Sequence, residues 1–190
     1  IVPLLVLALF GSAGAQNTVT HPAPAQAQPL VIVGATVHPV SGAAIENGRI
    51  RFEAGRIIAV GADVPTDGAQ VVEASGKHVY PGLFAANTVV GLVEVSAVRA
   101  TDDTAEVGAI NSNVRAEVAV NPDSELIPVT RANGVLAVLT HPVAGEQGVL
   151  TGTSAVLQLE GWTWEELTVR APVGMHLVWP SLLLPDYLPP

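Results

Sequence analysis

The chain has 190 residues, of which 8 are basic and 17 acidic, so its formal net charge is −9 at pH 7. Such an acidic chain offers no basic surface for phosphate backbones or anionic lipids, which excludes nucleic-acid binding as a function. Cysteine is absent, which excludes disulfides, thiol nucleophiles and cysteine-based zinc sites. Apolar residues make up 49% of the chain and charged residues 13%, which indicates a folded protein.

The first residues have the pattern of a secretory signal. An apolar run over residues 1–10 is followed by Ala13 and Ala15, the small residues that a signal peptidase accepts. The run is about half of the roughly 20 residues that span a bilayer, so we expect no stable membrane insertion after signal removal. We therefore predict a signal peptide over 1–15 and a periplasmic or secreted protein; a buried N-terminal helix is the alternative. Residues 16–29, rich in proline, alanine and glutamine, are predicted to be a flexible leader.

Residues 30–80 are predicted to form a small sheet. Polar and apolar residues alternate over 49–53, which places Ile50 and Phe52 on one face. Gly55 can take a positive φ in a hairpin turn that joins this strand to the next. The predicted strands cover residues 30–33, 49–53, 57–60, 71–74 and 78–80.

After Pro81 the pattern changes to helix followed by strand. Asn121 is a predicted helix cap, Pro122 suits the first helical position, and Gly134 suits the helix end. Pro128 lies between them, so we expect a kink or two short helical pieces. The apolar run 135–139 predicts a strand buried on both faces in a parallel sheet.

A second helix start is predicted near residue 163. Thr163 can cap the amide of Glu166, and Glu166 can reach back to Thr163, which is the pattern of a capping box. Trp162 can then pack on Leu167 as a hydrophobic staple, with ligand stacking on the tryptophans as the alternative. Residues 173–179 predict a further strand.

Histidines are the first candidates for chemistry, although none has HxH or HExxH spacing. His141 follows a predicted buried strand, and the carboxyl ends of strands face the active site in an α/β barrel. His141 therefore ranks first and His176 second as functional histidines. His38 and His78 belong to the small sheet, where an exposed or hydrogen-bonded histidine is the default interpretation.

Other sequence patterns give weaker indications of a functional site. Asp102, Asp103 and Glu106 form an acidic cluster that lacks EF-hand spacing and is better explained as a solvated loop. Ser154 lacks the glycine that a nucleophile elbow needs, and the glycines near 145–152 form no phosphate-binding loop.

Several segments together resemble one known family. They read VGATV at 33–37, ENGRI at 46–50, GRIIAVG at 55–61 and ASGKHVYPGL at 74–83, with RANGV at 131–135. This succession resembles the amidohydrolase superfamily, particularly its imidazolonepropionase-like members, and the resemblance covers roughly residues 30–180.

The resemblance implies a fold class and a division into domains. It implies a mixed chain, β followed by α/β, in which 30–80 form part of a composite β-sandwich. It also implies that 81–190 form the first strands and helices of a (β/α)8 TIM barrel, apparently truncated because a barrel typically needs about 250 residues. The remainder of its own barrel is then a partner, and apolar faces meant for it predict poor solubility of this chain alone.

The resemblance also implies a divalent metal, usually zinc, held in part by two histidines on the first barrel strand. Here Asn87 and Val89 stand at those two positions. An amide oxygen is a poor zinc ligand and valine is none, so the sequence does not support binuclear zinc. Asn87, His141 and His176 are the weak metal candidates that remain, and the catalytic residues are unassigned.

Two functions follow from the resemblance. The first is an exported, metal-dependent hydrolase. When complete, it would cleave C–N bonds in non-peptide amides of small molecules by metal-activated water. We expect this chain alone to be inactive. The second is a non-catalytic binding protein with the amidohydrolase fold that has lost the strand-one metal ligands.

Overall fold

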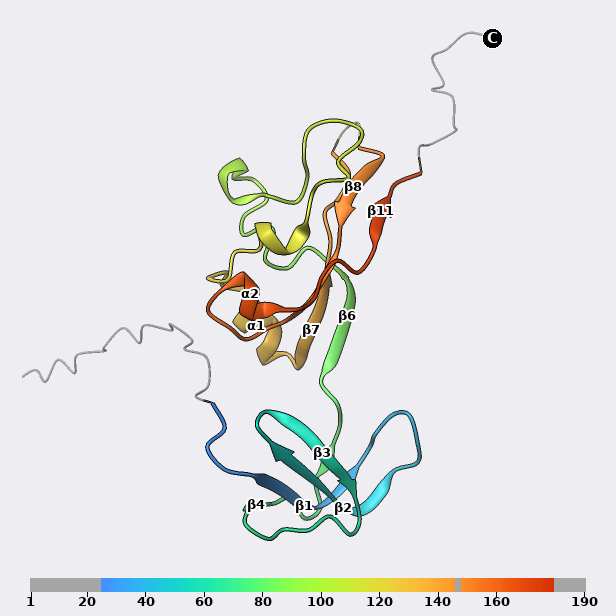
Figure 1. The fold of residues 1–190 in the computed structure, drawn as a ribbon, viewed down its shortest axis with the longest axis vertical. Coiled ribbons are helices and arrows are strands. Elements are labelled where there is room, and N and C mark those ends of the chain that lie inside the picture. Colours follow the sequence, from blue (N-terminus) through green and yellow to red (C-terminus); the bar gives the residue numbers. More distant parts are fainter. Residues whose placement is uncertain (1–24, 146–147, 180–190) are drawn as a thin grey trace, which may run out of the picture.

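The computed structural model describes residues 25–145 and 148–179, which form two parts joined near Pro81 (Figure 1). The predicted signal peptide and most of the predicted leader lie outside these residues. The first part contains β1 (Leu30–Val37), β2 (Ile45–Glu53), β3 (Arg56–Gly61), β4 (Gln70–Glu73) and β5 (His78–Val79). The second contains β6 (Leu83–Thr88), η1 (Arg99–Thr101), η2 (Ala116–Ala119), α1 (Leu126–Ala132), β7 (Val135–Thr140), β8 (Leu150–Thr153), β9 (Ala155–Gln158), α2 (Trp164–Leu167), β10 (Thr168–Arg170) and β11 (Met175–Leu177).

The first part is one five-stranded sheet. Its strands follow the order β3-β2-β1-β4, and β5 also pairs with β1, in parallel. The β2–β3 hairpin turns at Ala54 and Gly55, whose φ values of 47° and 73° are those of the mirror-image turns that fit the twist of a hairpin. Ile50 and Phe52 both belong to the core of this sheet, which confirms that they share a face.

A bulge in β1 sets which side chains reach that core. The β1–β2 register shifts between Ile32 and Ala35, and Gly34 within the shift has a φ of 77°. A bulge moves the following side chains to the other face, so Ile32 and Ala35 both pack into the same core despite their odd spacing. A side chain at Gly34 would meet the Ser75 hydroxyl at 2.6 Å, so glycine is required there.

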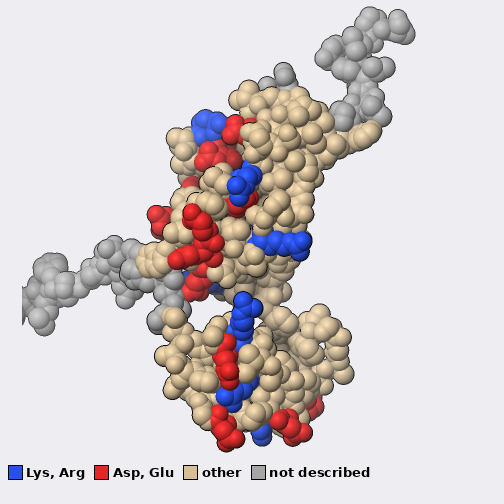
Figure 2. Space-filling view, in the orientation of Figure 1, with Lys and Arg blue, Asp and Glu red and all other residues tan. Residues whose placement is uncertain are grey.

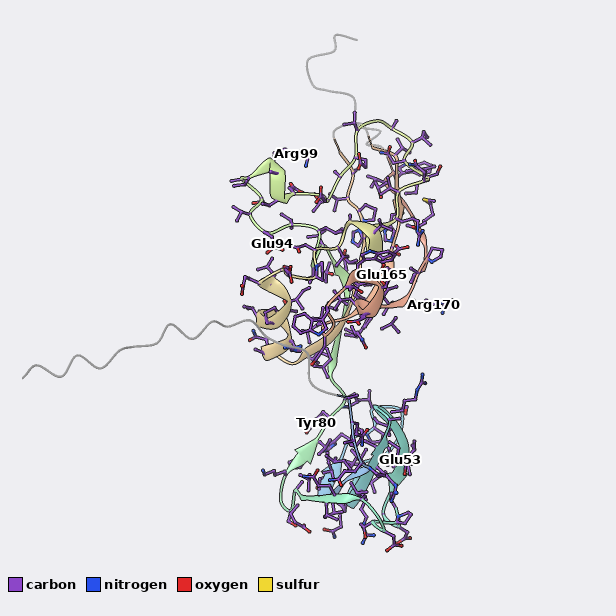
Figure 3. All side chains as sticks on the ribbon, turned by 60° about the vertical axis from the view of Figure 1, so that its left-hand side comes forward. Glu53, Tyr80, Glu94, Arg99, Glu165 and Arg170 are labelled. Atoms are coloured by element: carbon purple, nitrogen blue, oxygen red, sulfur yellow. The ribbon has the colours of Figure 1, made fainter. Side chains whose placement is uncertain are left out.

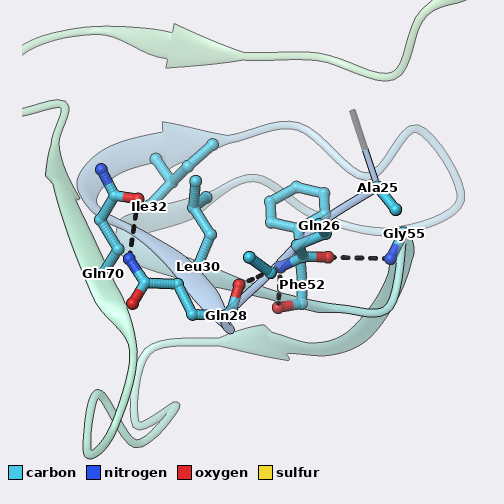
Figure 4. Close-up of a pocket in the computed structure, with 9 residues that line it drawn as sticks. Ala25, Gln26, Gln28, Leu30, Ile32, Phe52, Gly55 and Gln70 are labelled. Carbon is cyan, nitrogen blue, oxygen red and sulfur yellow. Dashed lines mark hydrogen bonds between the residues drawn. The ribbon is translucent and has the colours of Figure 1, made fainter. Parts of the chain in front are cut away.

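The end of the predicted leader is bound to this sheet. The Gln26 amide nitrogen donates to the Phe52 carbonyl at 2.9 Å, and its oxygen accepts from the Gly55 amide at 2.8 Å. Gln26, Phe52 and Gly55 are among the residues that line a groove over Leu30 and Ile32 (Figure 4). Among the described residues, those that line the groove have no titratable side chain and offer apolar contact and amide hydrogen bonds.

The second part is built around a four-stranded sheet with the order β10-β9-β7-β6. Strands β6 and β7 are parallel and are joined through η1, η2 and α1, which makes one strand–helix–strand step. The next neighbour, β9, is antiparallel to β7, and β8 pairs with β11 in a separate ribbon. The described residues therefore contain one step of the kind that barrels repeat, within a mostly β structure.

The helix before β7 starts later than its sequence predicts. Asn121 caps the Asp123 amide at 3.1 Å in a turn, and α1 begins only at Leu126. Pro128 consequently falls in the first turn of α1, where its missing N–H would have had no helical partner, and the predicted kink is absent. The helix ends as predicted, at Ala132, with Gly134 at a φ of 87°.

Strand β7 is fully buried over only part of its length. Leu136 and Val138 are two residues apart and so share a face of the strand, yet Val138 is fully buried and the side chain of Leu136 is 51% exposed. Val135, Ala137 and Leu139, on the other face, are half-buried, so the prediction of a strand buried on both faces is wrong. The core that Val138 joins consists of Leu92, Ala116, Val120, Ile127, Val138, Ala155, Leu157, Leu159 and Leu167.

The capping box forms with a shifted second arm. Thr163 accepts from the Glu166 amide at 3.3 Å, as predicted, but the Glu166 carboxylate accepts from the amide of Trp162 rather than that of Thr163. Trp164 packs against the core, while Trp162 is half exposed. Residues 173–179 contribute the short strand β11.

Charged side chains are thinly spread over the surface. Figure 2 shows them in small groups of mixed sign, with wide areas between that carry no charge. Many large apolar side chains in the described residues are exposed, including Leu83 at 61% and Phe84 at 52%. Within the same residues, no helix combines the length and apolarity needed to cross a membrane.

Candidate functional site

Parallel pairing of β6 and β7 brings two of the candidate residues to one edge of the sheet. Asn87 is next to the last residue of β6, and His141 directly follows β7. The backbone amide of His141 donates to the Thr88 carbonyl at 3.1 Å, which fixes the two strand ends side by side. The carboxyl ends of parallel strands are where α/β proteins build their sites, and this edge is the corresponding place here.

The side chains of Asn87 and His141 are hydrogen-bonded. His141 Nε2 lies 2.5 Å from Asn87 Oδ1, and His141 Nδ1 lies 3.1 Å from the Pro142 carbonyl oxygen. A carbonyl oxygen only accepts, so Nδ1 carries a proton and donates. A neutral ring then accepts at Nε2 from the Asn87 amide nitrogen, whereas a ring protonated on both nitrogens donates to Oδ1. The Asn87 amide can serve either state by turning over.

The Pro142 carbonyl that orients His141 is itself held. The hydroxyl of Thr151, on β8, donates to it at 3.0 Å, and Thr151 is only 2% exposed. The His141 ring is therefore positioned by a buried contact from another strand. Sequence reasoning missed Thr151, because nothing in the sequence places β8 beside the loop that follows β7.

His176, on β11, completes the cluster. Its ring lies on the His141 ring with 4.5 Å between centroids and 6° between planes. Burial lowers the pKa of His176, and the nearby His141 lowers it further, so His176 is the group in this cluster that favours the neutral form. The structure thus brings together Asn87, His141 and His176, which the sequence identified from three separate segments.

This cluster does not fit the zinc that the resemblance implies. A metal lies in the plane of each imidazole that binds it, and two parallel, stacked rings share no such point. Asn87 already occupies Nε2 of His141. Val89, at the second histidine position of the family, packs against the apolar core. In residues 25–145 and 148–179 no three histidine, aspartate or glutamate side chains converge to hold a metal ion.

The remaining sequence candidates lie apart from this cluster. Thr104 donates to Asp102 Oδ1 from both its amide and its hydroxyl, and these two hydrogen bonds lower the pKa of Asp102 in an exposed loop. Ser154 is 1% exposed and its hydroxyl donates to the Gly174 carbonyl, which suits a structural serine.

One buried acid was not identified from the sequence. Glu117, in η2, is fully buried, and its Oε1 accepts from Arg115 at 2.6–2.7 Å. Its Oε2 has no hydrogen-bond partner among the described residues. An acid between two alanine-rich segments carries no signal of burial in the sequence.

A known structure has a similar fold. An amidohydrolase from Thermotoga maritima MSB8 matches over 80% of this chain and 39% of its own length, with a TM-score of 0.72 and 24% identity. A prolidase complexed with N-methylphosphonate-L-proline (TM-score 0.40, 22% identity, 58% of this chain and 25% of its own) and a molinate hydrolase (0.29, 29%, 35% and 15%) match less of it. No family model and no curated protein matches the chain.

The described chain therefore has the fold of part of an amidohydrolase, which confirms the resemblance in its sequence. It spans 39% of the length of the Thermotoga protein.

Proposed function

We propose that the complete protein is a hydrolase of the amidohydrolase type that cleaves C–N bonds in non-peptide amides of small molecules. The observation that carries the proposal is the Asn87–His141–His176 cluster at the carboxyl ends of β6 and β7 in a chain of amidohydrolase fold. The signal pattern of residues 1–15 adds that the protein is exported.

The described residues contribute substrate binding in this proposal. Pro142 and Asn87 engage both ring nitrogens of His141, so the exposed Asn87 amide presents the remaining hydrogen-bond donor and acceptor. An amide substrate has the complementary acceptor and donor on its C=O and N–H groups. Because the cluster does not fit zinc, we assign none of its side chains to metal binding.

Full-length protein purified without chelators tests the proposal. We expect bound divalent metal by elemental analysis and hydrolysis of a panel of cyclic and N-acyl amides. Asn87→Ala should raise KM by about tenfold, the effect of about 1.4 kcal/mol that losing a hydrogen bond to substrate produces. Absence of metal together with absence of hydrolysis after zinc is added would overturn the hydrolase assignment.

A second function is favoured by one specific observation. Asn87 blocks Nε2 of His141 and Val89 is part of the core, so the first barrel strand is built without metal ligands. This arrangement suits a non-catalytic protein that binds a small amide. Under that function, the same amides should raise the melting temperature of the full-length protein and remain intact by mass spectrometry.

A further inference from the structure

The two rings of the stacked histidine pair differ in what their nitrogens contact. Both nitrogens of His141 are engaged, Nδ1 by the Pro142 carbonyl and Nε2 by the Asn87 side chain. Neither ring nitrogen of His176 has a hydrogen-bond partner among residues 25–145 and 148–179. A neutral imidazole always has one nitrogen with a free lone pair. His176 is therefore the member of the cluster that can accept a proton from a bound molecule.

Strand pairing holds the His176 ring in place and leaves part of it open. His176 pairs with Gly152 on β8, and a glycine at that position adds no side chain over the ring. The Val178 amide donates to the Val149 carbonyl at 2.8 Å, which ties β11 to the segment before β8. The His141 ring covers one face of the imidazole, and the residue as a whole is half-buried. The ring is thus preorganised and still in contact with solvent.

The surroundings of His176 keep its imidazole neutral at pH 7. Burial lowers the pKa of His176, and the neighbouring His141 lowers it further. No carboxylate among the described residues counteracts this shift. Arg170, the last residue of β10, is exposed, and Figure 3 shows its side chain extending outward from the strand. The imidazole is therefore in the form that a proton acceptor needs.

We propose that His176 is the general base of the hydrolysis inferred above, an assignment that rests on the proposed function. One proton of a water molecule passes to a ring nitrogen of His176 as the water oxygen bonds to the amide carbonyl carbon. The C–N bond then breaks, and His176 returns the proton to the leaving nitrogen, which gives a carboxylic acid and an amine. Asn87 binds the amide, and His141, with both nitrogens engaged, takes no part in the proton transfer.

Acylation by diethyl pyrocarbonate tests the free nitrogen without requiring turnover. The reagent acylates a neutral imidazole at the nitrogen with a free lone pair, and peptide mass spectrometry of the full-length protein gives the rate for each histidine. We expect His176 to react at least about fivefold faster than His141, the factor by which one hydrogen bond protects a nitrogen. Asn87→Ala frees Nε2 of His141, so it should raise the rate of His141 alone. Equal rates for the two histidines in the wild-type protein would overturn the assignment.

Turnover separates this assignment from the proposed function. Wild-type full-length protein is assayed first, and an enzyme that hydrolyses no amide overturns the hydrolase and its base together. With active protein, His176→Phe keeps the stacked ring and should lower kcat by about 100-fold or more, with little change in KM. The acidic limb of the kcat/KM pH profile should disappear.

A control variant on the same strand completes the turnover test. Met175→Leu changes the neighbouring residue of β11, which is 45% exposed, and should leave kcat unchanged. Circular dichroism shows whether both variants are folded. Wild-type kcat in a folded His176→Phe protein would overturn the base assignment and leave the hydrolase standing.

Discussion

The two parts of the molecule each contain a pair of histidines, and the pairs differ in how their rings meet. In the first sheet, His38 and His78 meet nitrogen to nitrogen at 2.9 Å. In the second part, His141 and His176 lie face to face, with 4.5 Å between centroids. The first arrangement is a hydrogen bond between two ring nitrogens, whereas the second places the rings in nearly parallel planes. Neither directs two lone pairs at one metal ion.

This difference shows that ring orientation matters more than proximity. The fold likeness leads one to look for metal at the strand ends of the second part, yet the stacked rings there do not converge on an ion. The stacked pair instead suits contact with a polar, planar group, because one ring is oriented by Pro142 and Asn87 while the other covers its face.

The largest expected effect comes from the core of the second part. Leu157, on β9, is 1% exposed, so Leu157→Ala should lower the free energy of unfolding by about 2–5 kcal/mol in urea denaturation. Leu136→Ala is the control, because Leu136 is 51% exposed and should lose under about 1 kcal/mol. Equal losses in the two variants would contradict this difference in burial.

A smaller effect is expected when the family's second histidine is restored. Val89→His puts a polar ring among apolar neighbours and should cost about 1–3 kcal/mol of stability. Asn87→His, at an exposed position, should cost under about 1 kcal/mol.

The double variant should gain no stoichiometric zinc. Zinc bound with unchanged stability would show that the strand can carry the family's metal pair after all, and that the stacked pair is not the obstacle.

Removing the hydrogen bond to His141 should have a modest effect. Asn87→Ala leaves Nε2 to solvent, and we expect a loss of about 0.5–1 kcal/mol, the usual net value of one exposed hydrogen bond. The His141 Nε2 resonance should shift in nitrogen NMR spectra. Asn113→Ala, at an exposed position in the loop before η2, is the control and should alter neither quantity.

The smallest expected effect is the loss of stability at acidic pH. Because the pKa of His176 is lowered in the folded state, the unfolded chain takes up the proton first, and stability falls as pH drops below about 6.5. His176→Phe keeps the stacked ring without titrating, so its melting temperature should fall less between pH 7.5 and 5.5. An identical fall in both proteins would show that His176 is not responsible.

The first sheet was the more predictable region, because its signals are local. Alternation around Ile50 and Phe52 and the turn at Gly55 are each contained in a few residues, and both agree with the structure. The pairing of β1 with β5 joins residues some forty positions apart, so the contact between His38 and His78 had no signal in the sequence.

In the second part, a general rule singled out the candidate residues, and features that depend on neighbours were missed. The rule that sites lie at strand ends singled out His141, and the structure places Asn87 and His176 against it, while their role in a site stays a prediction. The burial of Leu136 and the start of α1 depend on what packs nearby, which single-residue patterns do not contain. Glu117 is the extreme case, since its burial comes entirely from tertiary packing.

Strand β6 has a consequence for how the chain behaves at high concentration. It lies at the edge of its sheet, where charged residues or prolines normally prevent pairing with another extended chain. Its sequence from Leu83 to Thr88 contains neither. Leu83 and Phe84 are also exposed along it. We therefore expect this chain to self-associate through strand addition at β6, and a lysine at position 84 or 86 to suppress the oligomers.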